Sequence, residues 1–204
     1  MAYEYEVFVS YRRSNEWPRF IEGTFLPMFR HWLSAEMDRP PRIFFDVGMV
    51  ESGHLWPRVL ADGLAGSKVM LCLWSREYFG SDWCLAELAH MLARRDAVAE
   101  LTGASPPLVL PAVIHDGEHI DAGLGDIQRL NIQPFANPWM APGSPAAEEL
   151  SNHIRKFAAH VAHAIERAPE HDPGWSKLAT DKFVDVYRKT SRQTTVPSLG
   201  GRPS

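Results

Sequence analysis

A chain of 204 residues, 45% of them hydrophobic and 23% charged, has the size and composition of a globular protein with one core, with or without an appendage. Its net charge of −4 argues against nucleic acid or an anionic membrane as partner, and no apolar run is long enough to span a bilayer. Two cysteines make no disulfide framework, and the acidic N-terminus is unlike a secretion signal, so we expect a cytoplasmic protein.

The first half of the chain alternates predicted strands and helices. Ser14 or Asn15 is expected to cap the first helix, which Gly23 and Pro27 make irregular. The predicted elements are a strand over residues 5–11, this helix, a strand over 42–46, a loop over 47–53, a helix over 54–65 and a nearly continuous apolar strand over 68–74.

The second half continues the alternation. Its predicted elements are a helix capped by Ser81 or Asp82 and running to about Arg95, a strand over 108–114, a loop over 115–126, a short strand over 130–132 and a helix over 145–167. Repeated strand–helix alternation is typical of a parallel sheet with helices on both faces. We therefore predict an α/β, flavodoxin-like three-layer sandwich with a central parallel five-stranded sheet, over residues 1–168.

Residues 169–204 lie outside this pattern. We expect a linker over 169–174 and a polar, disordered end over 190–204. Between them, a short helix is predicted that packs either on the domain or on a partner, from the partial helical spacing of Trp175, Leu178, Phe183, Val186 and Tyr187.

Three segments carry the most specific pattern in the chain. They are Val7-Phe8-Val9-Ser10-Tyr11-Arg12-Arg13, then Phe44-Phe45-Asp46 through Glu51-Ser52-Gly53, then Ser67 to Ser75 followed by Tyr78, Ser81, Trp83, Cys84 and Glu87. In order and spacing they resemble the first box, the second box with its BB loop, and the third strand and helix of TIR (Toll/interleukin receptor) domains. The resemblance covers roughly residues 3–165. The third family box usually has Phe-Trp, whereas here three residues separate Phe135 from Trp139.

The resemblance is to the bacterial, NAD-cleaving kind of TIR domain, and it implies that Glu87 is the catalytic residue. Nicotinamide leaves as a neutral pyridine and needs no acid, so one carboxylate can stabilise the oxocarbenium-like charge or trap the ribosyl carbon. Taken alone, Glu87 is more typical of a residue that caps or salt-bridges its own helix. On the enzymatic interpretation NAD+ is the substrate, and neither a cofactor nor a metal ion is expected.

Residues beside the first and third strands are candidates for binding the dinucleotide. Arg12 and Arg13 suit phosphates because the guanidinium fork makes two contacts, or they lie solvated with one paired to Asp46. Tyr11 and Trp83 suit stacking on nicotinamide or adenine, although Trp83 is equally suited to anchoring its helix.

The remaining candidates come from turns and from the BB loop. Ser75 either binds the ribose or caps its turn. For Asp46, a structural role in holding its loop is favoured over a part in the reaction. The expected substrate-binding set also includes Gly53, Trp56 and Tyr78.

Two functions remain open from the sequence. The first is an NAD+ glycohydrolase or ADP-ribosyl cyclase in bacterial immune defence or signalling, activated by self-association or by contact with other TIR domains through the loop 47–56. The second is a TIR scaffold that assembles without turnover. Two other classes of α/β protein are less favoured. A Rossmann dehydrogenase would have a GxGxxG motif after the first strand, and this chain has none. A phosphoacceptor receiver domain would have acidic residues at the end of that strand, where this chain has Ser10-Tyr11-Arg12-Arg13.

Overall fold

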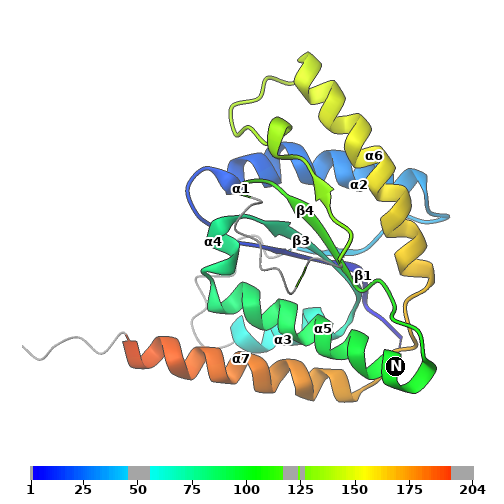
Figure 1. Ribbon diagram of the computed structural model, residues 1–204, viewed down its shortest axis with the longest axis vertical. Coiled ribbons are helices and arrows are strands. Elements are labelled where there is room, and N and C mark those ends of the chain that lie inside the picture. The colour runs from blue at the N-terminus through cyan, green and yellow to red at the C-terminus, as the bar shows by residue number, and fades with distance from the viewer. Residues whose placement is uncertain (1, 46–55, 117–123, 125–126, 194–204) are drawn as a thin grey trace, which may run out of the picture.

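A computed structural model describes residues 2–45, 56–116, 124 and 127–193, except the side chains of 56–57 and 184–193. Five strands and their connecting helices make up the fold (Figure 1). The strands are β1 (Tyr5–Tyr11), β2 (Ile43–Phe44), β3 (Ser67–Trp74), β4 (Val109–Val113) and β5 (Leu130–Asn131). The helices are α1 (Trp17–Phe20), η1 (Ile21–Phe25), α2 (Leu26–Ala35), α3 (Trp56–Ala65), α4 (Arg76–Phe79), α5 (Asp82–Thr102), η5 (Gln133–Phe135), α6 (Pro145–Glu166) and α7 (Gly174–Gln193).

The strands form one parallel sheet in the order β2-β1-β3-β4-β5. β3 lies at its centre, and seven of its eight residues are buried because helices cover both faces. In the register of this sheet, Ser10 of β1 lies beside Cys72 of β3. The predicted α/β, flavodoxin-like fold with a five-stranded parallel sheet is confirmed.

Helices cover the two faces of the sheet in separate groups. α1, α2 and α6 lie on one face, and α3 and α5 lie on the other, with α7 running along the outside of α3 and α5 (Figure 1). The carboxyl ends of the parallel strands share one edge of the sheet, so the residues that follow β1 and β3 meet there.

The start of the first helix differs from the prediction. Glu16 occupies the N-cap position without a side-chain hydrogen bond, and Ser14 contributes only its carbonyl oxygen to Trp17 N, at 3.2 Å. Asn15 has a φ of 51°, a left-handed conformation that asparagine tolerates better than most residues. Asn15 therefore turns the chain and does not cap the helix. The predicted irregularity around Gly23 is confirmed, because Ile21–Phe25 form a π-helix.

α5 extends seven residues further than the predicted end near Arg95, to Thr102. Gly103, with a φ of 72°, ends it in the left-handed conformation that favours glycine. Ser81 is the N-cap, and its Oγ accepts a hydrogen bond from Cys84 N. Of the two predicted N-cap residues, Ser81 is therefore the one confirmed. His90 and Arg94 are polar but fully buried on this helix. Its buried face is therefore not marked in the sequence by apolar residues alone.

α7 is a 20-residue helix that packs on the domain. Its buried residues Trp175, Ala179 and Phe183 recur every four residues and join the core under α3 and α5. The end of the chain, 194–204, and the loop 47–55 lie outside the described residues. Of the helices in the described part of the chain, none combines the length and apolar character needed to cross a membrane.

Candidate functional site

A cavity of about 270 Å³ lies at the carboxyl end of β1, between β1, α3 and the first turns of α5. It is lined by Phe8, Val9, Tyr11, Arg12, Arg13, Leu60, Ser81, Trp83, Cys84 and Glu87. Edges of this kind are where open parallel sheets bind ligands, because the loops and helix starts that follow the strands converge there.

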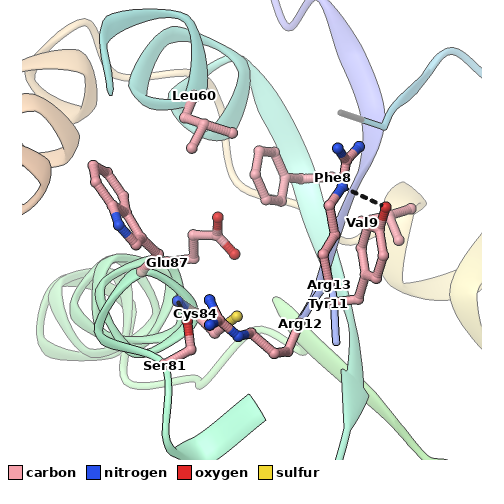
Figure 2. Close-up of a pocket in the computed structure, with 10 residues that line it drawn as sticks. Phe8, Val9, Tyr11, Arg12, Arg13, Leu60, Ser81, Cys84 and Glu87 are labelled. Atoms are coloured by element: carbon pink, nitrogen blue, oxygen red, sulfur yellow. Dashed lines mark hydrogen bonds between the residues drawn. The ribbon is translucent and has the colours of Figure 1, made fainter. Parts of the chain in front are cut away.

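Glu87 is the buried carboxylate of this cavity. Its side chain extends from α5 into the space between Leu60 of α3 and Phe8 of β1 (Figure 2). Only 7% of the residue is exposed, and Ser10 Oγ donates a hydrogen bond of 2.5 Å to Glu87 Oε2. The carboxylate therefore does not lie on the helix surface, as its position in the sequence taken alone suggests, because the first turns of α5 face β1.

A short chain of hydroxyl groups holds this carboxylate. Tyr78 OH lies 2.9 Å from Ser10 Oγ and 3.4 Å from the carbonyl oxygen of Cys84. The Ser10 hydroxyl gives its one proton to Glu87, so the Tyr78 hydroxyl is the donor of this group, with Ser10 Oγ and the Cys84 carbonyl oxygen as its two acceptors. Burial raises the pKa of Tyr78 well above its usual value, which keeps the phenol protonated for this role. Glu87 is thus oriented from behind by groups of β1 and α4.

The exit of β1 supplies the cationic side of the cavity. Arg13 Nε donates to Tyr11 OH at 2.9 Å, and the Tyr11 ring stacks on Phe45 at 5.2 Å between centroids. Tyr11 OH also donates to Glu22 at 3.1 Å, and burial is the main cause that raises the pKa of Tyr11 to about 12. Arg12 is exposed on the rim and approaches α5 (Figure 2).

Cys84 lines the cavity as a neutral thiol. Burial is the largest cause that raises its pKa to about 12, with the Glu87 carboxylate adding to the effect. The nearby Arg12 charge acts in the opposite direction but is weaker than burial. A thiol with this pKa is a poor nucleophile at neutral pH, so Cys84 contributes shape rather than reactivity.

A sequence model of the TIR domain family matches residues 7–141 of this chain. The match covers about two thirds of the 204 residues and includes every residue that lines the cavity. The chain belongs to the TIR domain family. No curated protein matches it. The matched region of this TIR domain ends before α6 and α7 begin.

The fold brings five predicted site residues of the TIR domain to one cavity: Tyr11, Arg12, Arg13, Trp83 and Glu87. Trp83 both lines the cavity and stacks on Phe183 of α7, so the two alternatives for this residue are compatible.

Two further predicted residues lie behind the cavity rather than in its wall. Ser75 is the N-cap of α4, where Ser75 Oγ accepts a hydrogen bond from Tyr78 N at 3.2 Å. Tyr78 is fully buried and reaches Glu87 through Ser10. Asp46 and Gly53 lie outside the described residues, as does the side chain of Trp56 at the start of α3.

Sequence reasoning did not select Ser10 as a site residue, although it lies within the first TIR box. A small polar residue within an apolar strand, one position before the strand ends, is the signal that marks it. Sequence reasoning also did not place Phe8, Val9, Leu60, Ser81 and Cys84 in the site, and these complete the lining. Apolar residues such as Phe8, Val9 and Leu60 have no chemical signature, so their place in a cavity wall depends on the tertiary fold.

Proposed function

We propose that this TIR domain is an NAD+ nucleosidase that cleaves the bond between nicotinamide and ribose. The observation that carries the proposal is the position of Glu87, a buried carboxylate inside a cavity whose rim carries Arg12 and Arg13. A carboxylate is rarely buried without a structural partner or a function. Here its Oε2 atom is oriented by Ser10, while its side chain extends into the cavity.

The chemistry that this site would perform needs one carboxylate. As the C–N bond to nicotinamide breaks, the bonding electrons leave with the pyridine nitrogen and positive charge develops on the ribosyl carbon. Glu87 would stabilise that charge electrostatically or bond to the carbon. Water then adds to the carbon and yields ADP-ribose with release of one proton, or a nucleophile of the same ADP-ribose unit adds and yields a cyclic product.

The size and charge of the cavity support binding of a dinucleotide by one end. At about 270 Å³ the cavity is at the small limit of ligand pockets, so it suits the nicotinamide riboside half rather than all of NAD+. The pyrophosphate would then lie at the rim, within reach of Arg12 and Arg13. Tyr11 and Trp83 present flat rings in the wall, suitable for stacking on a base.

The first test is incubation of the concentrated protein with NAD+, followed by chromatography of the products. The wild type is expected to release nicotinamide, and Glu87→Gln is expected to lower the rate by more than about 100-fold, because the amide cannot stabilise the cationic carbon. Glu100→Gln, an exposed carboxylate at the far end of α5, is the matched control and should retain full activity. The co-product distinguishes ADP-ribose from a cyclic isomer.

A second variant tests the role of the rim. Arg12→Ala is expected to raise KM for NAD+ about tenfold through loss of a charge-assisted hydrogen bond, with kcat nearly unchanged. Nicotinamide riboside has no phosphate, so the variant should cleave it as the wild type does. Arg76→Ala, an exposed arginine on α4, is the control. An equal loss on both substrates would contradict pyrophosphate binding by Arg12.

We further propose that activity depends on self-association, through the segment 47–56, in bacterial immune defence or signalling. TIR domains commonly interact with other TIR domains, which supports this proposal. Activity per molecule should therefore rise with protein concentration, and Gly53→Pro should reduce both association and turnover. A wild-type protein that releases no nicotinamide even when artificially clustered would favour the second function, a TIR scaffold without turnover.

A further inference from the structure

α7 is the part of the molecule that the proposed chemistry does not yet use. It lies beyond the region matched by the TIR family, yet it packs against both helices that supply one wall of the cavity (Figure 1). α3 contributes Leu60 to that wall, and α5 contributes Trp83, Cys84 and Glu87. A helix in this place can determine the shape of the cavity without touching its contents.

One contact joins α7 directly to the cavity wall. The rings of Phe183 and Trp83 stack, with centroids 5.6 Å apart and an interplanar angle of 22°. Phe183 is fully buried, whereas Trp83 is half-buried and lines the cavity. The Phe183 ring therefore covers one face of the Trp83 indole and limits the rotation of that side chain.

A second contact fixes the other end of α7 on α5. The guanidinium of Arg94 lies 3.9 Å from the centroid of a Trp175 ring, a cation–π contact. Arg94 is itself fully buried and donates to the carbonyl oxygen of Ser67 at 3.0 Å. The order of the contacting residues is reversed between the two helices: Trp175 precedes Phe183 on α7, whereas its partner Arg94 follows Trp83 on α5. The helices are thus antiparallel, and the position of Phe183 along α5 is fixed.

We propose that Phe183 is a positioning residue of the site, which holds the Trp83 ring in the cavity wall in the orientation that receives the flat base of the substrate. This inference rests on the proposed NAD+ cleavage for the identity of the base. Removal of Phe183 leaves a space behind Trp83, into which the indole can rotate. Binding of the base is then weakened, whereas Glu87 keeps its hydrogen bond to Ser10.

The first experiment does not depend on enzymatic activity. Of the two cysteines of the chain, Cys84 reports on the cavity wall and Cys72 serves as the internal reference. Cys84 follows Trp83, lines the cavity and is 3% exposed, whereas Cys72 lies in the central strand and is 0% exposed. Both thiols are modified with iodoacetamide at a fixed alkaline pH, and each is quantified by peptide mass spectrometry. Phe183→Leu is expected to raise the labelling rate of Cys84 about tenfold and to leave that of Cys72 unchanged.

The matched control is Phe157→Leu, the same substitution at a buried position of α6 on the opposite face of the sheet. It should leave both labelling rates unchanged. Equal acceleration of Cys72 and Cys84 in Phe183→Leu would mean that the variant merely unfolds more often, and would overturn the inference. An unchanged rate for Cys84 would also overturn it.

The second experiment measures kinetics with NAD+. Phe183→Leu is expected to raise KM about fivefold to tenfold with little change in kcat, because the lost contact acts on binding of the base and not on the reacting carbon. In a Trp83→Ala background the same substitution should have no further effect on KM, since the two residues act through one contact. Additive effects of the two substitutions would overturn the inference.

The two experiments separate this inference from the proposed function. A wild type that shows no NAD+ turnover even when artificially clustered refutes the proposed function, while selective labelling of Cys84 still shows that Phe183 holds the cavity wall. If the wild type is active but Phe183→Leu has the same labelling rates and the same KM as Phe157→Leu, the proposed role of Phe183 is refuted and the proposed function is not.

Discussion

At the scale of single residues, the Ser10 hydroxyl connects groups that the sequence keeps far apart. It donates to Glu87 of α5 and accepts from Tyr78 of α4, and both Ser10 and Tyr78 are almost fully buried. A carboxylate held in this way loses little orientation freedom when substrate arrives, which favours catalysis. In the proposed reaction, Ser10 would therefore act through Glu87.

The Ser10→Ala substitution tests this arrangement. We expect kcat for NAD+ to fall by about 10-fold to 100-fold, because the freed carboxylate samples other rotamers, and the stability to fall by about 1 kcal/mol. Steady-state kinetics and urea unfolding measure the two effects. Tyr78→Phe, which leaves the Ser10–Glu87 contact in place, should lower kcat only a few-fold. An unchanged kcat in Ser10→Ala would show that Glu87 needs no support from β1.

At the scale of elements, a glycine allows α3 to approach β2 closely. A Cβ atom at Gly63 would lie 2.5 Å from Cε2 of Phe44, too close for any ordinary contact. The Phe44 ring cannot easily retreat, because it stacks on Phe8 at 5.1 Å and meets Tyr5 edge-on at 5.2 Å. This close packing also fixes Leu60, one turn earlier on α3, in the cavity wall.

Gly63→Ala is therefore expected to destabilise the protein by about 1–3 kcal/mol, as overpacking does, despite the better helix propensity of alanine. Gly23→Ala is the matched control, since that glycine is also helical and a Cβ there has no atom within 4 Å. The control should be neutral or stabilising by up to about 1 kcal/mol. Urea unfolding of both variants measures the difference. Equal stabilities would mean that Phe44 yields at little cost.

At the scale of the whole molecule, the fold encloses His90 of α5. The residue is fully buried, and among the described residues neither ring nitrogen has a hydrogen-bond partner. Burial is the largest cause that lowers the pKa of His90 to about 3, followed by the charges of Arg94 on α5 and Lys182 on α7. The folded protein therefore holds this imidazole in its neutral form.

A pH-dependent stability follows from the difference between the two states. The unfolded chain protonates His90 near its usual pKa of 6.5, whereas the folded chain does so only near 3, so acid favours unfolding between these values. We expect His90 to contribute a loss of up to about 1.4 kcal/mol per pH unit below pH 6. Urea unfolding at pH 7.5 and pH 5 measures this loss.

His90→Leu should remove most of the loss between these two pH values, and a variant with the wild-type pH dependence would contradict the assignment. His171→Gln is the comparison variant: burial also lowers the pKa of that histidine, which is less buried than His90, so this substitution should remove less of the loss than His90→Leu does. Burial acts to raise the pKa of Glu6, but the hydrogen bonds and charge of Arg42 together outweigh it and lower the pKa, so Glu6 costs stability only at pH values below its usual 4.5, outside the range of the experiment.

The sequence by itself determined the fold and much of the site. Apolar periodicity and strand–helix alternation predicted the five parallel strands, since these signals are local to each element. The resemblance to TIR domains then implied that Tyr11, Arg12, Arg13, Trp83 and Glu87 belong to one site. The cavity lined by these five residues agrees with that reasoning.

The tertiary structure alone decided how those residues are held. The burial of Glu87 and its contact with Ser10 join β1 to α5 across 77 positions, a distance over which no local pattern carries information. The docking of α7 was left open by a weak apolar spacing, because whether such a face packs on its own domain depends on the surface that α3 and α5 present.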